Sequence, residues 1–100
     1  MNLAAASDGN LCVTGLDRLS ASNCAAFKEL VKPRLTDHCR RLELDCSTIQ
    51  FIDSDGFGTL VNLNRRLAMH DGKLRLKQPS PMLRQSLHLL HLDEIFELTP

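Results

Sequence analysis

The chain lacks an excess of charge of either sign, because its 12 Lys and Arg residues are matched by 12 Asp and Glu residues. Without a net charge it has no overall field to concentrate nucleic acid. Tryptophan and tyrosine are also absent, and no basic cluster is interleaved with aromatic side chains that could stack on bases. We therefore expect no direct binding of DNA or RNA.

A long hydrophobic run is missing as well. No stretch approaches the roughly 20 apolar residues that a membrane-spanning helix needs. Residues 1–6 have neither the basic start nor the apolar core of a secretory signal. The sequence therefore predicts a soluble, cytoplasmic protein with no membrane span. Its 100 residues are enough for one domain that buries most of its apolar surface, and we expect a single domain over residues 1–100.

The cysteines lack the C-x-x-C spacing of metal sites and redox motifs, and no secretory signal directs the chain to an oxidising compartment. We expect reduced thiols that behave as small apolar residues. Cys46 follows a predicted buried strand, and Cys24 and Cys39 fall in or near the first predicted helix. The fourth cysteine is Cys12.

Hydrophobic periodicity predicts alternating strands and helices. Residues 2–6 and 11–14 have the pattern of two strands joined by a D-G turn suited to a hairpin. A helix that Ser22 or Asn23 can cap follows them, and Pro33 ends or kinks this helix. Its apolar residues at helical spacing are Ala26, Phe27, Leu30, Val31 and Leu35.

The middle of the chain predicts a strand and a second helix. Residues 41–52 are expected to form one continuous strand through a short irregular segment at Cys46 and Ser47. The following helix carries a broad apolar stripe, and Gly72 ends it as a left-handed cap. The stripe consists of Phe57, Leu60, Val61, Leu63, Leu67 and Ala68.

The last part of the chain predicts a strand, a helix and a short strand. Residues 73–77 alternate strictly between polar and apolar side chains. Ser80 can cap a helix that has Pro81 at its first position, and residues 95–98 can form the last strand. One face of this helix would carry Met82, Leu83, Ser86, Leu87 and Leu90. Strands that alternate with helices indicate an α/β fold, and right-handed crossovers make its central strands parallel.

Residues 51–60 contain a strand end, a helix start and a polar position, and we call them the signature segment. Residues 49–52 have the pattern of the end of a buried strand, Asp53 can cap a helix, and apolar residues return at helical spacing from Phe57. The segment reads F-I-D-S-D-G-F-G-T-L and resembles the I-D-S-S-G-L-G signature of the STAS domain, the fold of bacterial anti-sigma factor antagonists. In that family a partner kinase phosphorylates the second serine of the signature, and Asp55 occupies that position here.

The resemblance extends along most of the chain. Residues 15–17, 42–45, 71–76 and 92–96 match further STAS motifs in the same order. It implies a single STAS-like domain with a small mixed sheet of about five strands, the central ones parallel, and three main helices. It also implies a binding module whose partner is an anti-sigma factor serine kinase. Binding that kinase would free a sigma factor.

The predicted partner surface covers the start and the outer face of the second helix. The free backbone N–H groups and the positive end of the dipole at a helix start favour negative charge, and glycines leave the backbone bare for a close approach. The residues we assign to partner binding are Asp53, Ser54, Asp55, Gly56, Gly58, Thr59, Asn62 and Arg66.

Two interpretations of Asp55 are open. A phosphoserine carries about −1.5 to −2 charges, so aspartate imitates it in part, with the same sign, less charge and fewer acceptor oxygens. Alternatively, Asp55 is only a favourable residue for the first turn of a helix.

An enzymatic interpretation is disfavoured. The segment from Asp53 also resembles the D-x-D-G opening of haloacid-dehalogenase-type phosphatases, in which the first aspartate is the nucleophile. That motif ends the first strand of a larger domain and needs a downstream lysine and an acidic pair, whereas here it lies in the middle of a short chain. His88 and His91 share a helix face at a spacing that can hold a metal ion, but no cysteine or carboxylate is obviously placed to complete the site. We therefore predict no catalytic residue, no metal and no cofactor.

Ser54 agrees with a second function known among STAS domains, that of a transporter subunit. The STAS subunit of phospholipid-transport ABC complexes, which docks on the ATPase, has a serine or threonine at the position of Ser54, and the next residue is often not serine. Ser54 followed by Asp55 agrees with that pattern. The sequence therefore leaves two functions open, the sigma-factor pathway and the transporter subunit.

Overall fold

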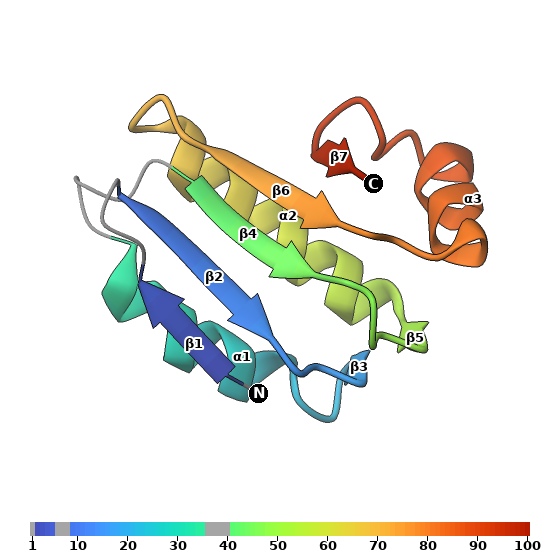
Figure 1. Ribbon diagram of the computed structural model, residues 1–100, viewed down its shortest axis with the longest axis horizontal. Coiled ribbons are helices and arrows are strands. Elements are labelled where there is room, and N and C mark those ends of the chain that lie inside the picture. Colours follow the sequence, from blue (N-terminus) through green and yellow to red (C-terminus); the bar gives the residue numbers. More distant parts are fainter. Residues whose placement is uncertain (1, 6–8, 36–40) are drawn as a thin grey trace.

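The computed structural model describes residues 2–5, 9–35 and 41–100. Its main sheet contains five strands in the order β1-β2-β4-β6-β7 (Figure 1). Their bounds are β1 (Asn2–Ala5), β2 (Asn10–Thr14), β4 (Arg41–Asp45), β6 (Lys73–Lys77) and β7 (Glu97–Thr99). β1 pairs with β2 in antiparallel fashion, as the predicted hairpin requires, and the other neighbours are parallel. Residues 6–8 of the predicted turn lie outside the described residues. The predicted fold class, a mixed sheet with parallel central strands, is confirmed.

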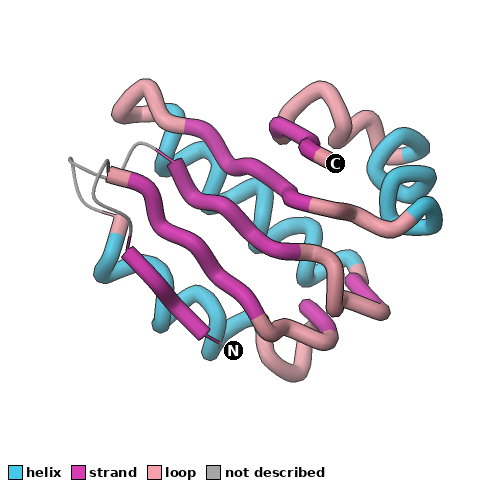
Figure 2. Tube along the Cα trace, viewed as in Figure 1, coloured by secondary structure: helices cyan, strands magenta, loops and turns pink. Residues whose placement is uncertain are grey.

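Three α-helices accompany this sheet: α1 (Cys24–Val31), α2 (Ser54–Ala68) and α3 (Pro81–Leu89). Figures 1 and 2 show α1 and α2 on one face of the sheet, whereas α3 lies beyond the carboxyl end of β6. The predicted break at Pro33 is confirmed, because α1 gives way to a short 3-10 helix, η1 (Lys32–Arg34). None of the described helices is long and apolar enough to span a lipid bilayer.

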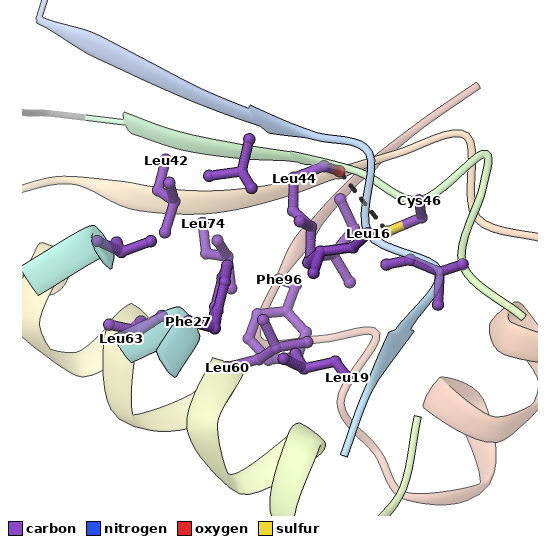
Figure 3. Packing of buried hydrophobic residues seen from close by; sticks show 14 of the residues in the cluster. Leu16, Leu19, Phe27, Leu42, Leu44, Cys46, Leu60, Leu63, Leu74 and Phe96 are labelled. Atoms are coloured by element: carbon purple, nitrogen blue, oxygen red, sulfur yellow. Dashed lines mark hydrogen bonds between the residues drawn. The ribbon is translucent and has the colours of Figure 1, made fainter. Parts of the chain in front are cut away.

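The core lies between the sheet and the helices α1 and α2 (Figure 3). Alternate leucines of β4 and β6 point into it, and Phe27 of α1 with Leu60 and Leu63 of α2 meets them from the other side. Cys46 is also buried, and this burial raises the pKa of its thiol to about 12. Its predicted role as an apolar filler is therefore confirmed. Cys12 and Cys24 are half-buried and free, and Cys39 lies outside the described residues.

Ion pairs cross the outer face of the sheet. Glu43, Arg75 and Glu97 occupy paired positions on β4, β6 and β7. Arg75 Nη2 donates to Glu97 Oε1 at 2.7 Å, and Arg75 Nη1 lies 3.6 Å from Glu43 Oε2. The hydrogen bond from Arg75 lowers the pKa of Glu97 below its ordinary value. The polar residues of the alternating strands thus neutralise one another across the sheet.

The predicted continuous strand over residues 41–52 is wrong. β4 ends at Asp45, and β5 (Phe51–Ile52) pairs instead with β3 (Arg18–Leu19) in a separate two-stranded sheet. A turn separates β4 from β5, because the Ile49 N–H donates to the carbonyl oxygen of Cys46 at 3.1 Å. The Phe51 side chain, expected in a buried strand, is 56% exposed.

Two predicted helix caps need correction. Asn23 occupies the N-cap position of α1, but its side chain makes no cap hydrogen bond. It accepts from the Ser20 N–H and donates to the carbonyl oxygen of Arg18, so it closes the preceding loop. The left-handed residue after α2 is Asp71, with φ 60°, and not Gly72.

The last helix confirms its predicted cap, because Ser80 Oγ accepts from the Leu83 N–H at 3.1 Å. Its predicted apolar face is only half correct. Leu83 and Leu87 are buried, but Met82 is 76% and Leu90 53% exposed. In the other helices, the predicted apolar residues that prove exposed are Ala26, Leu30 and Ala68.

Candidate functional site

The candidate site lies at the end of the molecule where the parallel strands terminate. β2, β4 and β6 all point toward this end (Figure 1), and β5 leads from there directly into α2. Parallel strands bring their carboxyl ends to one edge of the sheet, so loops that are distant in sequence meet there. The start of α2 and the loop after β3 therefore become neighbours.

Asp53 holds this corner together. Its Oδ1 accepts from the Gly56 N–H at 2.8 Å, which makes it the N-cap of α2, as predicted. Its Oδ2 accepts from the Ala21 N–H at 3.0 Å, in the loop after β3. The hydrogen bonds from Ala21 and Gly56 lower the pKa of the Asp53 carboxyl below its ordinary value. Because Asp53 occupies these donors, fewer N–H groups are left for an external anion than the sequence suggested.

Ser54 and Asp55 follow in the first turn of α2, and both are exposed. Neither side chain forms a hydrogen bond or ion pair within residues 2–5, 9–35 and 41–100. The carboxylate of Asp55 therefore presents its negative charge to solvent beside the positive end of the helix dipole. The hydroxyl of Ser54 is equally open to a partner.

The two glycines of the signature segment have opposite environments. Gly56 is buried, and a Cβ placed on it would lie 2.1 Å from the carbonyl oxygen of Leu19. The expected bare backbone at Gly56 is therefore wrong, since this glycine lets α2 pack against β3. Gly58 is exposed, and a Cβ there would meet nothing within 4 Å. Only Gly58 leaves an open stretch of backbone.

Four of the predicted partner residues line one exposed side of α2. Asp55, Gly58, Asn62 and Arg66 follow one another at steps of three or four residues, so they share a helix face, and all four are exposed. We call them the outer stripe. Thr59 does not belong to it, because it is buried and its Oγ1 donates to the carbonyl oxygen of Asp55 at 2.8 Å.

Sequence reasoning missed two parts of this region. One is the loop around Ala21, which no local pattern connects to Asp53. The other is a groove of about 250 Å³ between β5 and α3. Its lining includes Phe51, Ile52, Phe57, Met82, Leu83 and Ser86. The sequence did not indicate that Phe51 and Met82 are exposed, because apolar residues at regular spacing predict burial whether or not the fold covers them.

The described residues contain no group of three or more His, Cys, Asp or Glu side chains that could hold a metal ion. His88, considered above with His91, instead contacts Asp93, with 2.9 Å between Nδ1 and Oδ2. The hydrogen bond from His88 lowers the pKa of Asp93 below its ordinary value.

A family model described as "Mlab, STAS domain" matches residues 4–100. The chain belongs to the STAS domain family. This match covers nearly all of the elements described above, including the signature segment and the outer stripe. The resemblance that the sequence motifs indicated is thereby confirmed.

Solved structures of STAS proteins share this fold. A putative anti-sigma factor antagonist from Thermotoga maritima superposes with a TM-score of 0.88 at 23% identity, over 99% of this chain and 85% of that chain. The anti-sigma factor antagonist SpoIIAA in its unphosphorylated form gives a TM-score of 0.84 at 16% identity, over 99% and 87% of the two chains. The phosphorylated form of SpoIIAA from Bacillus gives 0.77 at 16% identity, over 99% and 90%. At these identities the likeness establishes the fold.

Proposed function

We propose that this STAS domain is an anti-sigma factor antagonist-like binding module of a cytoplasmic, bacterial partner-switching pathway that regulates transcription. The observation that carries the proposal is the outer stripe, where Asp55, Gly58, Asn62 and Arg66 lie exposed on one side of α2. The open backbone at Gly58 lets a partner approach closely, and the side chains around it supply charge and hydrogen-bonding groups. The proposed partner is an anti-sigma factor serine kinase.

Asp55 is central to how this module is regulated. It occupies the position where the family signature has its phosphorylated serine, and its carboxylate is solvent-exposed at a helix start. A permanent negative charge there resembles the phosphorylated state in sign and falls short of it in magnitude. The protein therefore behaves as a partially switched form that a kinase cannot modify at residue 55. SpoIIAA, of the same fold, has been solved both with and without phosphate.

The proposed module is not an enzyme. Asp53 would be the nucleophile of a phosphatase, but both of its carboxylate oxygens accept backbone hydrogen bonds, from Gly56 and Ala21. A phosphatase nucleophile must instead direct a carboxylate oxygen at the substrate, beside a neighbouring acid or base. The engagement of Asp53 in holding α2 and the preceding loop supports a structural role for this residue.

The direct test is the variant Asp55→Ser with a kinase that phosphorylates STAS domains. We expect the variant to accept phosphate at residue 55, and the natural protein to accept none there. The unphosphorylated variant should bind the kinase more tightly than its phosphorylated form, with the natural protein between the two. A titration of the kinase against the three forms measures this order, and Asp55→Ser/Ser54→Ala excludes phosphate transfer to the neighbouring hydroxyl. Equal affinities would mean that Asp55 is only a first-turn residue.

A second candidate is the STAS subunit of a phospholipid-transport ABC complex. The observation that favours it is the exposed Ser54, which lies at the first position of α2 and is followed by a residue other than serine. Under this alternative the outer stripe would contact a transporter ATPase. Co-expression with such an ATPase distinguishes the two, since a stable complex weakened by Ser54→Ala and unchanged in Asp55→Ser would favour the transporter.

A further inference from the structure

The surface of α3 carries large apolar side chains that remain exposed. Met82 is 76%, Leu89 70% and Leu90 53% exposed. Met82 and Leu89 are seven residues apart, so they lie on the same side of the helix, and Leu90 lies beside Leu89 at its end. We call these three residues the α3 stripe. Figure 1 shows α3 at the periphery of the fold.

The α3 stripe is continuous with the groove described above. Met82 and Ser86 of α3 line that groove together with Phe51 of β5 and Phe57 of α2. Phe51 is itself 56% exposed. One surface therefore combines a protruding row of apolar side chains with a neighbouring apolar hollow. In a two-fold pair, the ridge of each copy would face the groove of the other.

The exposed area is sufficient for a weak homodimer. If a large apolar side chain has about 150 Å² of surface, Phe51, Met82, Leu89 and Leu90 together expose about 400 Å² per copy. A pair would then bury about 800 Å² from these side chains alone, a large share of the about 1,200 to 2,000 Å² found for specific interfaces. The formal net charge of the chain is +0, so two copies do not repel each other.

We propose that this domain associates with a second copy of itself through the α3 stripe and the groove. The association does not involve the outer stripe residues as contacts and does not depend on the proposed kinase partner. It predicts a reversible homodimer in which Met82 of one copy lies near Phe51 of the other. Because the surface is modest in area, the dimer forms at high protein concentration and dissociates on dilution.

Sedimentation velocity over a wide range of protein concentration tests this, with reductant present so that cysteines form no cross-link. The mass should rise from that of one chain, 11.2 kDa, toward twice that value. Phe51→Asp and Met82→Asp should each hold the protein at the mass of one chain over the whole range. The matched control is Met69→Asp, since Met69 is 80% exposed at the far end of α2 from the groove. This control should associate like the natural protein.

Circular dichroism establishes that each variant is folded, and Met82→Asp carries the test if Phe51→Asp does not fold. A single-chain mass at every concentration would overturn the proposal. So would association that persists in folded Met82→Asp, or association that Met69→Asp removes equally. If the natural protein stays monomeric and Met82→Asp weakens kinase binding, the groove belongs to the partner protein and the self-association proposal is wrong.

Discussion

The carboxylate of Asp53 and the backbone N–H of Ala21 are 32 residues apart in the chain and are joined by a hydrogen bond of 3.0 Å. The same carboxylate caps α2 through the Gly56 N–H. One side chain thus fixes the start of the helix and the loop after β3 relative to each other. The outer stripe begins at this corner, so the position of Asp55 depends on Asp53.

Asp53→Ala should lower the thermal midpoint at neutral pH, because it removes the cap of α2 and the hydrogen bond to Ala21. Hydrogen bonding lowers the folded-state pKa of Asp53 below its ordinary value of 3.8. Its stabilising contribution is therefore fully present above that value and is lost as the pH falls through the lower folded-state pKa. Thermal melts of both proteins against pH should show their midpoints converging at acidic pH. Asp53→Ser keeps a cap acceptor and should lie between the two at neutral pH, and a constant gap at all pH values would contradict this account.

Gly56→Ala and Gly58→Ala should have opposite effects on stability. A methyl group on Gly56 would lie 2.1 Å from the carbonyl oxygen of Leu19. Relieving this clash requires the backbone of β3 or α2 to shift, which costs free energy. We expect a loss of about 1 to 3 kcal/mol, as for other overpacked sites. Gly58 has open space around it, so alanine there should stabilise the helix by about 0.5 to 1 kcal/mol. Urea unfolding of both variants measures the difference, and two equal losses would mean that the packing of α2 on β3 is misassigned.

Gly58→Arg should weaken binding of the cognate partner while leaving the thermal midpoint nearly unchanged. The substitution adds bulk to the open backbone in the middle of the outer stripe, where no contact within the domain is lost. Calorimetric titration of the partner and a thermal melt measure the two properties separately. Ala26→Arg places the same side chain at an exposed position of α1, outside both the outer stripe and the α3 stripe, and should bind normally. An unfolded Gly58→Arg variant would show that this position is packed.

The purified protein should release no phosphate from a generic phosphoester in the presence of magnesium. Asp53 is engaged in two backbone hydrogen bonds, and the described residues contain no cluster of acidic side chains that could hold the magnesium ion beside it. A colorimetric phosphate assay at high enzyme concentration measures this directly. Turnover that disappears in Asp53→Asn would refute the binding-module proposal, whereas turnover that persists in that variant would indicate a contaminating phosphatase.

The sequence alone determined the features that depend on neighbouring residues. The alternation of residues 73–77 predicted the two faces of β6, and Ser80 and Asp53 were recognised as helix caps because a cap bonds to an N–H only three residues away. The order of strands and helices, together with the signature segment, identified the STAS fold. The exposed position of Asn62 and Arg66 also followed from helical periodicity.

Only the tertiary structure decided which surfaces the domain itself covers. Gly56 and Gly58 are two residues apart and look alike in sequence, but Leu19 covers one and nothing covers the other. Phe51 and Met82 have the spacing of core residues and remain exposed, because the described part of the chain packs few side chains against them. The separation of β5 from β4 likewise depends on pairing with β3, more than thirty residues earlier. Periodicity shows which residues share a face of a helix or strand. Contacts between segments distant in sequence decide whether that face is buried or exposed.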